Sequence, residues 1–189
     1  MVKTKSDIRK EILAQRKKLS SEEVTLLSEK IINNLVSTEE YELAKDILVY
    51  CSYNNEVETR NLINIALDDD KNVYLPKVHG DSMDFYCIND LSELVPGKMG
   101  IMEPLENDCN KYNGKPYSLV IMPLSAYDKN GNRIGYGGGF YDKYLASHIA
   151  GIRIGIAFSF QEFKDIPAEE TDIKLNYIIN EKEVINLYD

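Results

Sequence analysis

The residues best suited to chemistry lie in one ten-residue segment, Arg133–Asp142, of which four residues are glycine. Glycine allows positive φ and exposes backbone N–H groups, so that successive amides can point at one anion. Arg133 begins the segment with a guanidinium group that can bind two phosphate oxygens at once. Asp142 ends it with a carboxylate, the kind of ligand that Mg²⁺ prefers. The segment therefore contains the parts of a site for a metal-bound nucleotide.

Known phosphate-binding loops match this segment poorly. A P-loop requires Lys followed by Ser or Thr after its glycines, and neither pair follows the glycines of this segment. The dinucleotide-binding pattern begins at Gly135 and Gly137, but Phe140 stands where its third glycine belongs. A glycine cluster between a strand and a helix also fits a plain flexible loop. The flanking Arg133 and Asp142 favour a functional site over that alternative.

The composition predicts an acidic globular protein. The 189 residues are 43% hydrophobic and 28% charged, with a net charge of −9, which suits a single domain spanning residues 1–189. This charge argues against broad nucleic-acid binding. Residues 1–20 nevertheless carry seven basic and two acidic side chains, a net charge of +5. We expect this basic segment to act locally, against an anion.

Cysteine and histidine usage excludes several classes of site. Cys51, Cys87 and Cys109 are far apart, which favours a reducing cytoplasm over a disulfide framework or a zinc site. His79 and His148 are the only histidines, and neither lies in a nucleophile motif, so structural roles are predicted for both. The sequence has no apolar run long enough to span a membrane and no N-terminal signal core. We therefore expect a cytoplasmic protein that binds neither membrane nor nucleic acid.

The elements that must position these residues alternate between strands and helices. This pattern indicates an α/β fold with a largely parallel sheet. The expected strands are 46–51, 72–76, 83–88, 118–122, 152–158 and 177–180. The expected helices are 6–18, one that follows the capping box at 20–23, one that opens at residues 56–59, and 140–148. Residues 89–117 form a long irregular excursion, for which we expect a functional reason.

Parallel sheets form sites where their strands end. Segments 54–56, 128–139 and 159–161 each follow an expected strand, so they should meet on one side of the molecule. Lys5 and Arg9 are four residues apart and can share one helix face. The alternative for this pair is an ordinary solvated basic face.

With these elements placed, the sequence resembles the 5-formyltetrahydrofolate cyclo-ligases, also called 5,10-methenyltetrahydrofolate synthetases. The main match is segment 122–145, whose glycine run is similar to the family's Arg-Leu-Gly-x-Gly-x-Gly-Tyr-Tyr-Asp. Shorter matches occur in the family's order at 5–9, 53–58 and 158–161, and at Ile166-Pro167 followed by Asp172. The family's fold is a three-layer α/β/α sandwich, which agrees with the class that the elements indicate.

The resemblance implies an ATP- and Mg²⁺-dependent enzyme that converts 5-formyltetrahydrofolate to 5,10-methenyltetrahydrofolate, with release of ADP and phosphate. ATP would phosphorylate the formyl oxygen, N10 would attack the activated carbon, and loss of phosphate would leave the methenyl bridge. Phosphoryl transfer depends on alignment and charge stabilisation more than on a nucleophilic side chain. That explains a site without a useful His or Cys. We expect a monomer whose partners are 5-formyltetrahydrofolate and ATP.

The resemblance also implies roles for individual residues, with Arg133 as the catalytic group. ATP binding is implied for Lys5, Arg9, Arg133, Ile134, Gly135, Tyr136, Gly137, Gly138, Gly139, Phe140 and Tyr141. Folate binding is implied for Cys51, Glu56, Tyr136, Gly137, Gly138, Gly139 and Phe140. Asp142 and Asp172 match the metal carboxylates. A plain place in the core of a strand explains Cys51 equally well.

The chain departs from the family pattern at three points. Leu124 follows Pro123 where the family commonly has glycine, and Phe140 lacks the hydroxyl of the usual first tyrosine. The basic residue often found inside the glycine run is also absent. The phosphate charge would then be balanced by Arg133, Lys5 and Arg9, together with the metal and backbone amides.

Two other function classes remain open from the residues alone. In a non-catalytic nucleotide- or folate-binding module, Arg133, Asp142 and Asp172 would only bind. ATP turnover that depends on 5-formyltetrahydrofolate separates that module from an enzyme. A sugar-phosphate isomerase on a similar α/β architecture would use Glu56 as its general base and need no nucleotide.

Overall fold

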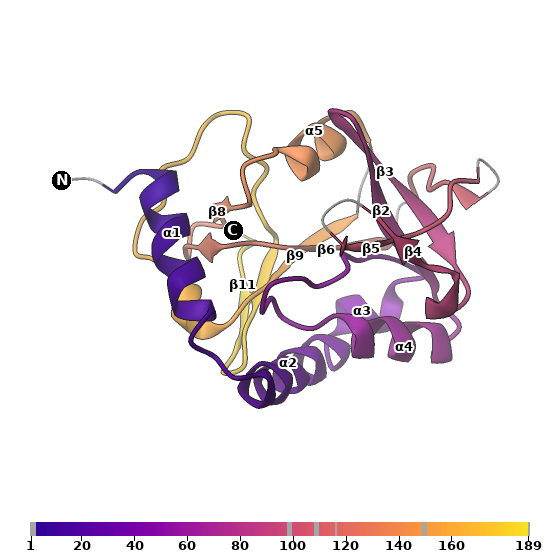
Figure 1. Ribbon diagram of the computed structural model, residues 1–189, viewed down its shortest axis with the longest axis horizontal. Helices are drawn as coiled ribbons and strands as arrows, with labels where there is room; N and C mark the ends of the chain where they lie inside the picture. The colour runs from indigo at the N-terminus through magenta and orange to yellow at the C-terminus, as the bar shows by residue number, and fades with distance from the viewer. Residues whose placement is uncertain (1–2, 98–99, 108–109, 116, 149–150, 189) are drawn as a thin grey trace.

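The computed structural model describes residues 3–97, 100–107, 110–115, 117–148 and 151–188, and its centre is a seven-stranded sheet (Figure 1). The strand order is β11-β10-β9-β6-β1-β2-β3, in which β10, β9, β6, β1 and β2 are paired in parallel. The edge pairs β2–β3 and β10–β11 are antiparallel. The strands are β1 (Asp46–Leu48), β2 (Asn72–His79), β3 (Ser82–Ile88), β6 (Ser118–Met122), β9 (Ile152–Ile156), β10 (Tyr177–Ile179) and β11 (Val184–Asn186). The predicted largely parallel sheet is confirmed.

Helices cover both faces of this sheet. α2 (Ser21–Val36), α3 (Glu39–Leu43) and α4 (Arg60–Asp68) lie on one face, and α5 (Phe140–Ser147) lies on the other (Figure 1). Successive side chains of a strand point to opposite faces. Ile47 of β1 accordingly packs in the core beneath α2 and α4, while Leu48 packs in the core beside α5. The predicted three-layer α/β/α sandwich is confirmed.

The basic N-terminal helix α1 (Lys5–Arg16) lies at one end of the sheet, beside a short hairpin of β7 (Ala126–Tyr127) and β8 (Arg133–Ile134) (Figure 1). Its apolar stripe of Ile8 and Ile12 packs against Ala126, Ile134 and Ile166. A capping box of Thr4 and Asp7 fixes its first turn. Because β8 leads directly into the glycine run, this packing places α1 beside that run.

Several boundaries differ from those predicted. β1 ends at Leu48 rather than at residue 51, although Val49 still donates to the Tyr74 carbonyl. The helix expected to open at residues 56–59 begins at Arg60, and the hydroxyl of its N-cap residue Thr59 donates to the Tyr50 carbonyl at 2.6 Å. The sequence did not predict α3, the β7–β8 hairpin or β11. It also missed η1 (Leu91–Glu93), β4 (Val95–Pro96), β5 (Met102–Glu103) and η4 (Ser159–Gln161).

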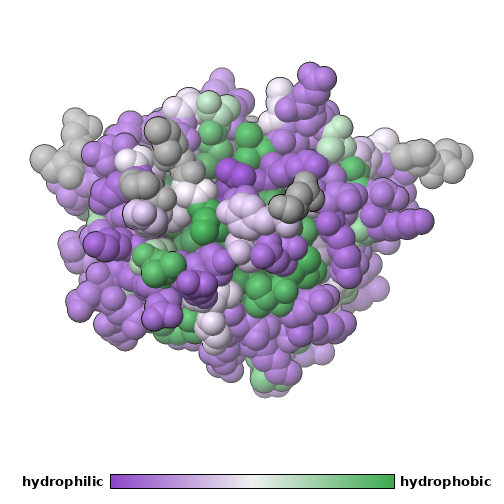
Figure 2. Space-filling view, turned by 180° about the vertical axis from the view of Figure 1, so that it is seen from behind, coloured by the Kyte–Doolittle hydropathy of each residue, from purple (hydrophilic) through white to green (hydrophobic). Residues whose placement is uncertain are grey.

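Hydrophilic side chains cover much of the face drawn in Figure 2, with hydrophobic groups between them. Within the ranges given above, no helix is long and apolar enough to cross a membrane. Cys51 and Cys87 are free thiols, and Cys109 lies outside the described residues.

Candidate active site

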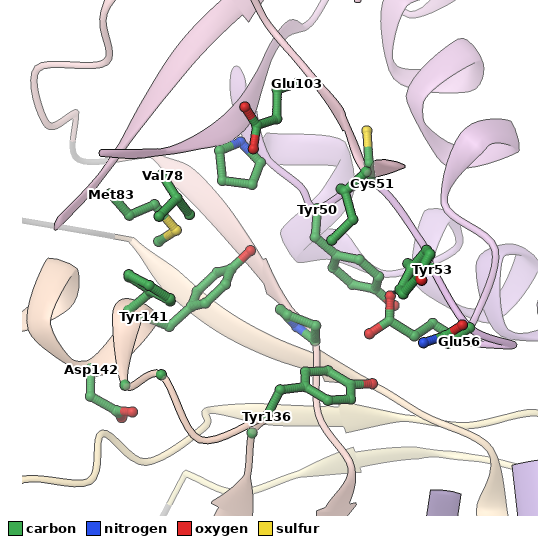
Figure 3. A pocket seen from close by; sticks show the side chains of 18 of the residues that line it. Tyr50, Cys51, Tyr53, Glu56, Val78, Met83, Glu103, Tyr136, Tyr141 and Asp142 are labelled. Carbon is green, nitrogen blue, oxygen red and sulfur yellow. The ribbon is translucent and has the colours of Figure 1, made fainter. Parts of the chain in front are cut away.

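A cavity of about 430 Å³ lies where β1 and β6 end, the position expected for a site in a parallel sheet (Figure 3). Its wall comes from the segment after β1, the β2–β3 hairpin, segment 101–103 and the glycine run. The lining residues are Leu13, Tyr50, Cys51, Tyr53, Asn54, Glu56, Pro76, Val78, Met83, Ile101, Met102, Glu103, Pro123, Arg133, Gly135, Tyr136, Gly138, Gly139, Phe140, Tyr141 and Asp142. The long excursion 89–117 thus contributes directly to this wall.

Most of the residues singled out from the sequence meet at this cavity. Ten of them line it: Cys51, Glu56, Arg133, Gly135, Tyr136, Gly138, Gly139, Phe140, Tyr141 and Asp142. Lys5, Arg9, Ile134, Gly137 and Asp172 are not among the lining residues. Segment 159–161 also lies outside the lining, where the Gln161 side chain donates to the backbone carbonyls of Leu124 and Ser125.

The glycine run has the backbone geometry that its composition predicts. Gly137 and Gly139 have φ of +99° and +63°, which glycine adopts without the strain of a side chain. Gly139 is the N-cap of α5 and makes no side-chain cap, so N–H groups of the first turn remain available to an anion. The Ile134 side chain packs with Ile8 and Ile12 instead, so only its backbone can serve this loop.

Arg133 is held in place by Asp142 at the edge of the cavity. The Arg133 side chain is only 5% exposed, and its Nη2 donates to Asp142 Oδ1 at 2.9 Å. The backbone N–H of Ile173 donates to the same oxygen at 3.0 Å. Arg133 Nε is buried and has no hydrogen-bond partner within the described part of the chain. The guanidinium is therefore fixed in orientation and keeps an unused donor.

Two cations of α1, Lys5 and Arg9, reach the neighbourhood of the glycine run. Arg9 Nε donates to the Gly135 carbonyl at 2.8 Å, beside Gly137. Lys5 Nζ lies 2.6 Å from Asp172 Oδ2 and 3.0 Å from Glu169 Oε1. Both side chains thus make long-range contacts, which favours a role at the glycine run over an ordinary solvated basic face.

The two carboxylates predicted as metal ligands each pair with a cation in the free chain, Asp142 with Arg133 and Asp172 with Lys5. Burial opposes ionisation of Asp172, but hydrogen bonds from Lys5 and the Glu169 backbone lower its pKa. No group of three or more His, Cys, Asp or Glu side chains suited to a metal occurs among the described residues. A metal here would need oxygen ligands from outside the protein as well.

Arg16 is a site residue that the sequence analysis missed. It is 1% exposed, and it donates to the carbonyls of Tyr53 at 3.2 Å, Asn54, and Asn55 at 3.0 Å. Its Nη1 also contacts the Tyr136 hydroxyl. Arg16 thereby joins the loop after β1 to the glycine run. Arg16 follows Ile8 and Ile12 at the same four-residue spacing and therefore lies on the same face of α1, which is the sequence feature that could have identified it.

Glu56 is partly buried in the wall opposite Asp142 (Figure 3). Burial raises the pKa of its carboxyl, while a hydrogen bond from the Tyr136 hydroxyl, a second from the Tyr53 backbone and the charge of Arg16 act against that rise. The Tyr53 N–H donates to Glu56 Oε2 at 2.8 Å. The loop after β1 and the glycine run together set the orientation of the Glu56 carboxylate in the cavity.

Cys51 and the two histidines are not placed to act as nucleophiles. Burial raises the pKa of the Cys51 thiol to about 11, so it is protonated at neutral pH and contributes an apolar contact. His148 stacks on Tyr144 with ring centroids 4.1 Å apart, and His79 Nδ1 lies 3.1 Å from Glu106. Neither histidine lines the cavity. These contacts agree with the structural roles predicted for both.

Two further polar side chains point into the cavity (Figure 3). Glu103 of β5 points in from segment 101–103, which belongs to the stretch 89–117 that was predicted only as irregular. Tyr141 of α5 does so with a buried hydroxyl that has no hydrogen-bond partner among the residues described. An apolar cavity with a few such polar groups is typical of a small-molecule site.

The 5-formyltetrahydrofolate cyclo-ligase family model matches residues 1–181 of this chain. The chain belongs to this family. A 5-formyltetrahydrofolate cyclo-ligase of Haemophilus influenzae is 31% identical over 176 residues, covering 90% of this chain and 94% of the relative. An Escherichia coli cyclo-ligase is 29% identical over 178 residues, covering 92% and 98%. The family predicted from the sequence is confirmed.

Solved structures give the same result for the fold. The NMR structure of Aquifex aeolicus 5,10-methenyltetrahydrofolate synthetase has a TM-score of 0.86 at 36% identity, covering 98% of this chain and 93% of its own. A 5,10-methenyltetrahydrofolate synthetase from Mycoplasma pneumoniae has a TM-score of 0.72 at 28% identity, covering 94% and 99%. Cyclo-ligases of this family convert 5-formyltetrahydrofolate to 5,10-methenyltetrahydrofolate, with ATP as a substrate.

Proposed function

We propose that this chain is the cyclo-ligase itself, converting 5-formyltetrahydrofolate and ATP to 5,10-methenyltetrahydrofolate, ADP and phosphate. One observation supports the proposal beyond family membership. Arg133, which is fixed and keeps an unused donor, and the N-terminus of α5, which has no side-chain cap, line the same cavity as a largely apolar wall that contains the acid Glu56. An anion site and a site for a flat, partly apolar ligand are what a reaction between ATP and a folate requires.

In this proposal the triphosphate binds along the glycine run and the N-terminus of α5. Arg133 provides the nearest fixed positive charge, and Arg9 and Lys5 extend it from α1. The folate binds against Cys51 and Glu56, with Tyr136 and Phe140 of the glycine run on its other side. The formyl group then lies near Arg133, where the two ligands meet.

The reaction proceeds in two steps. The formyl oxygen attacks the γ-phosphorus, a bond from oxygen to phosphorus forms, and ADP leaves with the electron pair of the broken bond. N10 then attacks the formyl carbon and loses its proton, and phosphate leaves to give the methenyl bridge. Arg133 stabilises the charge that develops on the transferring group, because its orientation is set before the substrates bind. The apolar wall limits the water that could compete with N10.

We also propose Mg²⁺ as cofactor, with Asp142 as its protein ligand and Asp172 contributing directly or through water. Both described contacts of the Asp142 carboxylate are made by Oδ1, which leaves Oδ2 for a metal. Mg²⁺ is usually held by one or two carboxylates, several waters and the substrate's phosphates, so this sparse donor set fits it. When bound, the ion neutralises phosphate charge.

Replacing Asp142 with asparagine should raise the Mg²⁺ concentration needed for half-maximal activity about tenfold or more, because a neutral amide is a weaker ligand. A Mg²⁺ titration of the initial rate at saturating ATP and folate measures the effect. Glu170→Gln, in the same charged stretch as Glu169 and exposed, is the matched control. If the titrations of Asp142→Asn and wild type coincide, Asp142 only orients Arg133 and α5.

Replacing Glu56 with glutamine should weaken folate binding by about 1–3 kcal/mol, because the N–H donors of the pterin ring lose a charged acceptor. ATP binding should stay nearly unchanged, because the glycine run and Arg133 remain in place. Calorimetric titration with each ligand separates the two effects. Glu58→Gln is the control, since Glu58 contacts Thr25 away from the cavity. Equal losses for both ligands would indicate general destabilisation instead.

The proposed function is tested by absorbance of the methenyl product, with and without ATP and Mg²⁺. Product that forms only with every component, together with stoichiometric ADP, supports the ligase. A non-catalytic binding module would give no ADP that depends on 5-formyltetrahydrofolate, and an isomerase would need no ATP. Either result, or product without ATP, contradicts the proposal.

We infer further that the enzyme is a cytoplasmic monomer. Cys51 and Cys87 are free thiols, which suits a reducing compartment. Sedimentation of the purified protein with and without ATP tests the oligomeric state.

A further inference from the structure

The Tyr141 hydroxyl is the feature of the cavity that the reaction described above leaves unused. It is buried, and within the described part of the chain it has no hydrogen-bond partner. Figure 3 shows it pointing into the cavity from the first turn of α5. A buried polar group without a partner costs about 1–3 kcal/mol, so native structures keep few of them. A bound ligand would supply the missing partner.

The surroundings of Tyr141 restrict its side chain and keep its hydroxyl protonated. Its ring packs edge-on against Phe85, with centroids 6.0 Å apart, which limits movement of the hydroxyl. Burial raises the pKa of this phenol, a rise that the charge of Glu56 increases and the charge of Arg133 opposes. The hydroxyl is therefore a neutral donor in the cavity that Glu56 and Arg133 also line.

Two other tyrosine hydroxyls at the cavity are already engaged. The Tyr50 hydroxyl donates to the Val57 carbonyl at 3.2 Å, and the Tyr136 hydroxyl contacts Arg16 and Glu56. Phe140, next to Tyr141, has no hydroxyl to offer. Among the described residues, Tyr141 is thus the tyrosine of this wall whose buried hydroxyl remains free to donate to a ligand.

We propose that Tyr141 is a further catalytic residue, whose hydroxyl donates a hydrogen bond to the oxygen that joins the formyl carbon to phosphorus. The assignment rests on the cyclo-ligase function proposed above. In the second step the N10–carbon bond forms, the carbon–oxygen bond breaks, and its electron pair passes to the phosphate oxygen. The N10 proton leaves to solvent. A fixed donor at that oxygen stabilises the negative charge as it develops.

The same helix offers a matched control. Tyr144 also has a buried hydroxyl without a partner in the described residues, and its ring also packs against Phe85, with centroids 5.0 Å apart. Tyr144 does not line the cavity. Tyr141→Phe and Tyr144→Phe therefore each remove one unpaired hydroxyl from α5, but only Tyr141→Phe removes a hydroxyl that faces the substrates.

The test compares wild type, Tyr141→Phe and Tyr144→Phe for kcat, thermal midpoint and single-turnover rates of ADP and methenyl formation. We expect Tyr141→Phe to keep or raise the midpoint while kcat falls by about 10²-fold. Methenyl formation should slow more than ADP formation, because the hydroxyl acts in the second step. Tyr144→Phe should retain kcat within about twofold of wild type, as expected for a change outside the site.

Three outcomes would overturn this assignment. Wild-type kcat in Tyr141→Phe shows that the hydroxyl does not act in the reaction, while the cyclo-ligase function stands. Equal slowing of ADP and methenyl formation, or a loss of kcat that follows a lowered thermal midpoint, shows a structural role. If wild type itself forms no methenyl product, the proposed function fails first and this assignment fails with it.

Discussion

Replacing Arg133 with alanine is expected to lower kcat by about 10²–10³-fold, equivalent to about 2.7–4 kcal/mol of transition-state stabilisation. The guanidinium is nearly buried, is oriented by Asp142 and keeps an unpaired Nε beside the glycine run. The glycine run contains no other basic residue that could replace it. A donor fixed before binding favours the transferring group over bound ATP, so kcat should fall more than ATP affinity.

Arg133→Lys should recover only part of the activity, because lysine keeps the charge but loses the planar set of donors. Arg153→Ala is the control, since Arg153 donates to the Lys174 carbonyl at 2.8 Å and does not line the cavity. Steady-state kcat is measured beside the thermal midpoint of each variant. An Arg133→Ala protein that is folded and within a few-fold of wild-type kcat would refute the catalytic role.

Replacing Arg16 with methionine should lower the free energy of unfolding by about 1–3 kcal/mol, the usual cost of leaving buried hydrogen-bonding groups without their partner. The substitution leaves the carbonyls of Tyr53, Asn54 and Asn55 without their donor and Glu56 without a neighbouring cation. Asn54 and Asn55 have φ of 50° and 54°, a left-handed conformation that the rest of the structure must stabilise. The loop after β1 should therefore loosen first.

Urea denaturation followed by circular dichroism measures this loss, with Lys10→Met as the control on the exposed side of the same helix. The control should change the free energy of unfolding by less than about 0.5 kcal/mol. Arg16→Lys should be intermediate, because one ammonium cannot reach three carbonyls and Tyr136 together. If Arg16→Met and Lys10→Met are equally stable, water replaces the arginine and the loop does not depend on it.

The local pattern of the chain was enough to predict the fold class and ten of the 21 residues that line the cavity. Buried strands such as Ser118–Met122 appear as short apolar runs, and the Ser20–Glu23 capping box places the start of α2. The glycine content of residues 135–139 predicted positive φ, which Gly137 and Gly139 adopt. Short elements were missed, because the two-residue strands of the β7–β8 hairpin have no periodicity to detect.

Which partner each charged group meets was decided only by the tertiary structure. Lys5 pairs with Asp172 across 167 positions and Arg16 meets Tyr136 across 120, because Ile8 and Ile12 pack α1 beside the hairpin that leads into the glycine run. Sequence periodicity reports only neighbours along one element. The chain by itself therefore determined which residue types were available for phosphate and folate chemistry. Packing determined their orientation: Arg133 held by Asp142, and Tyr141 aimed into the cavity without a partner.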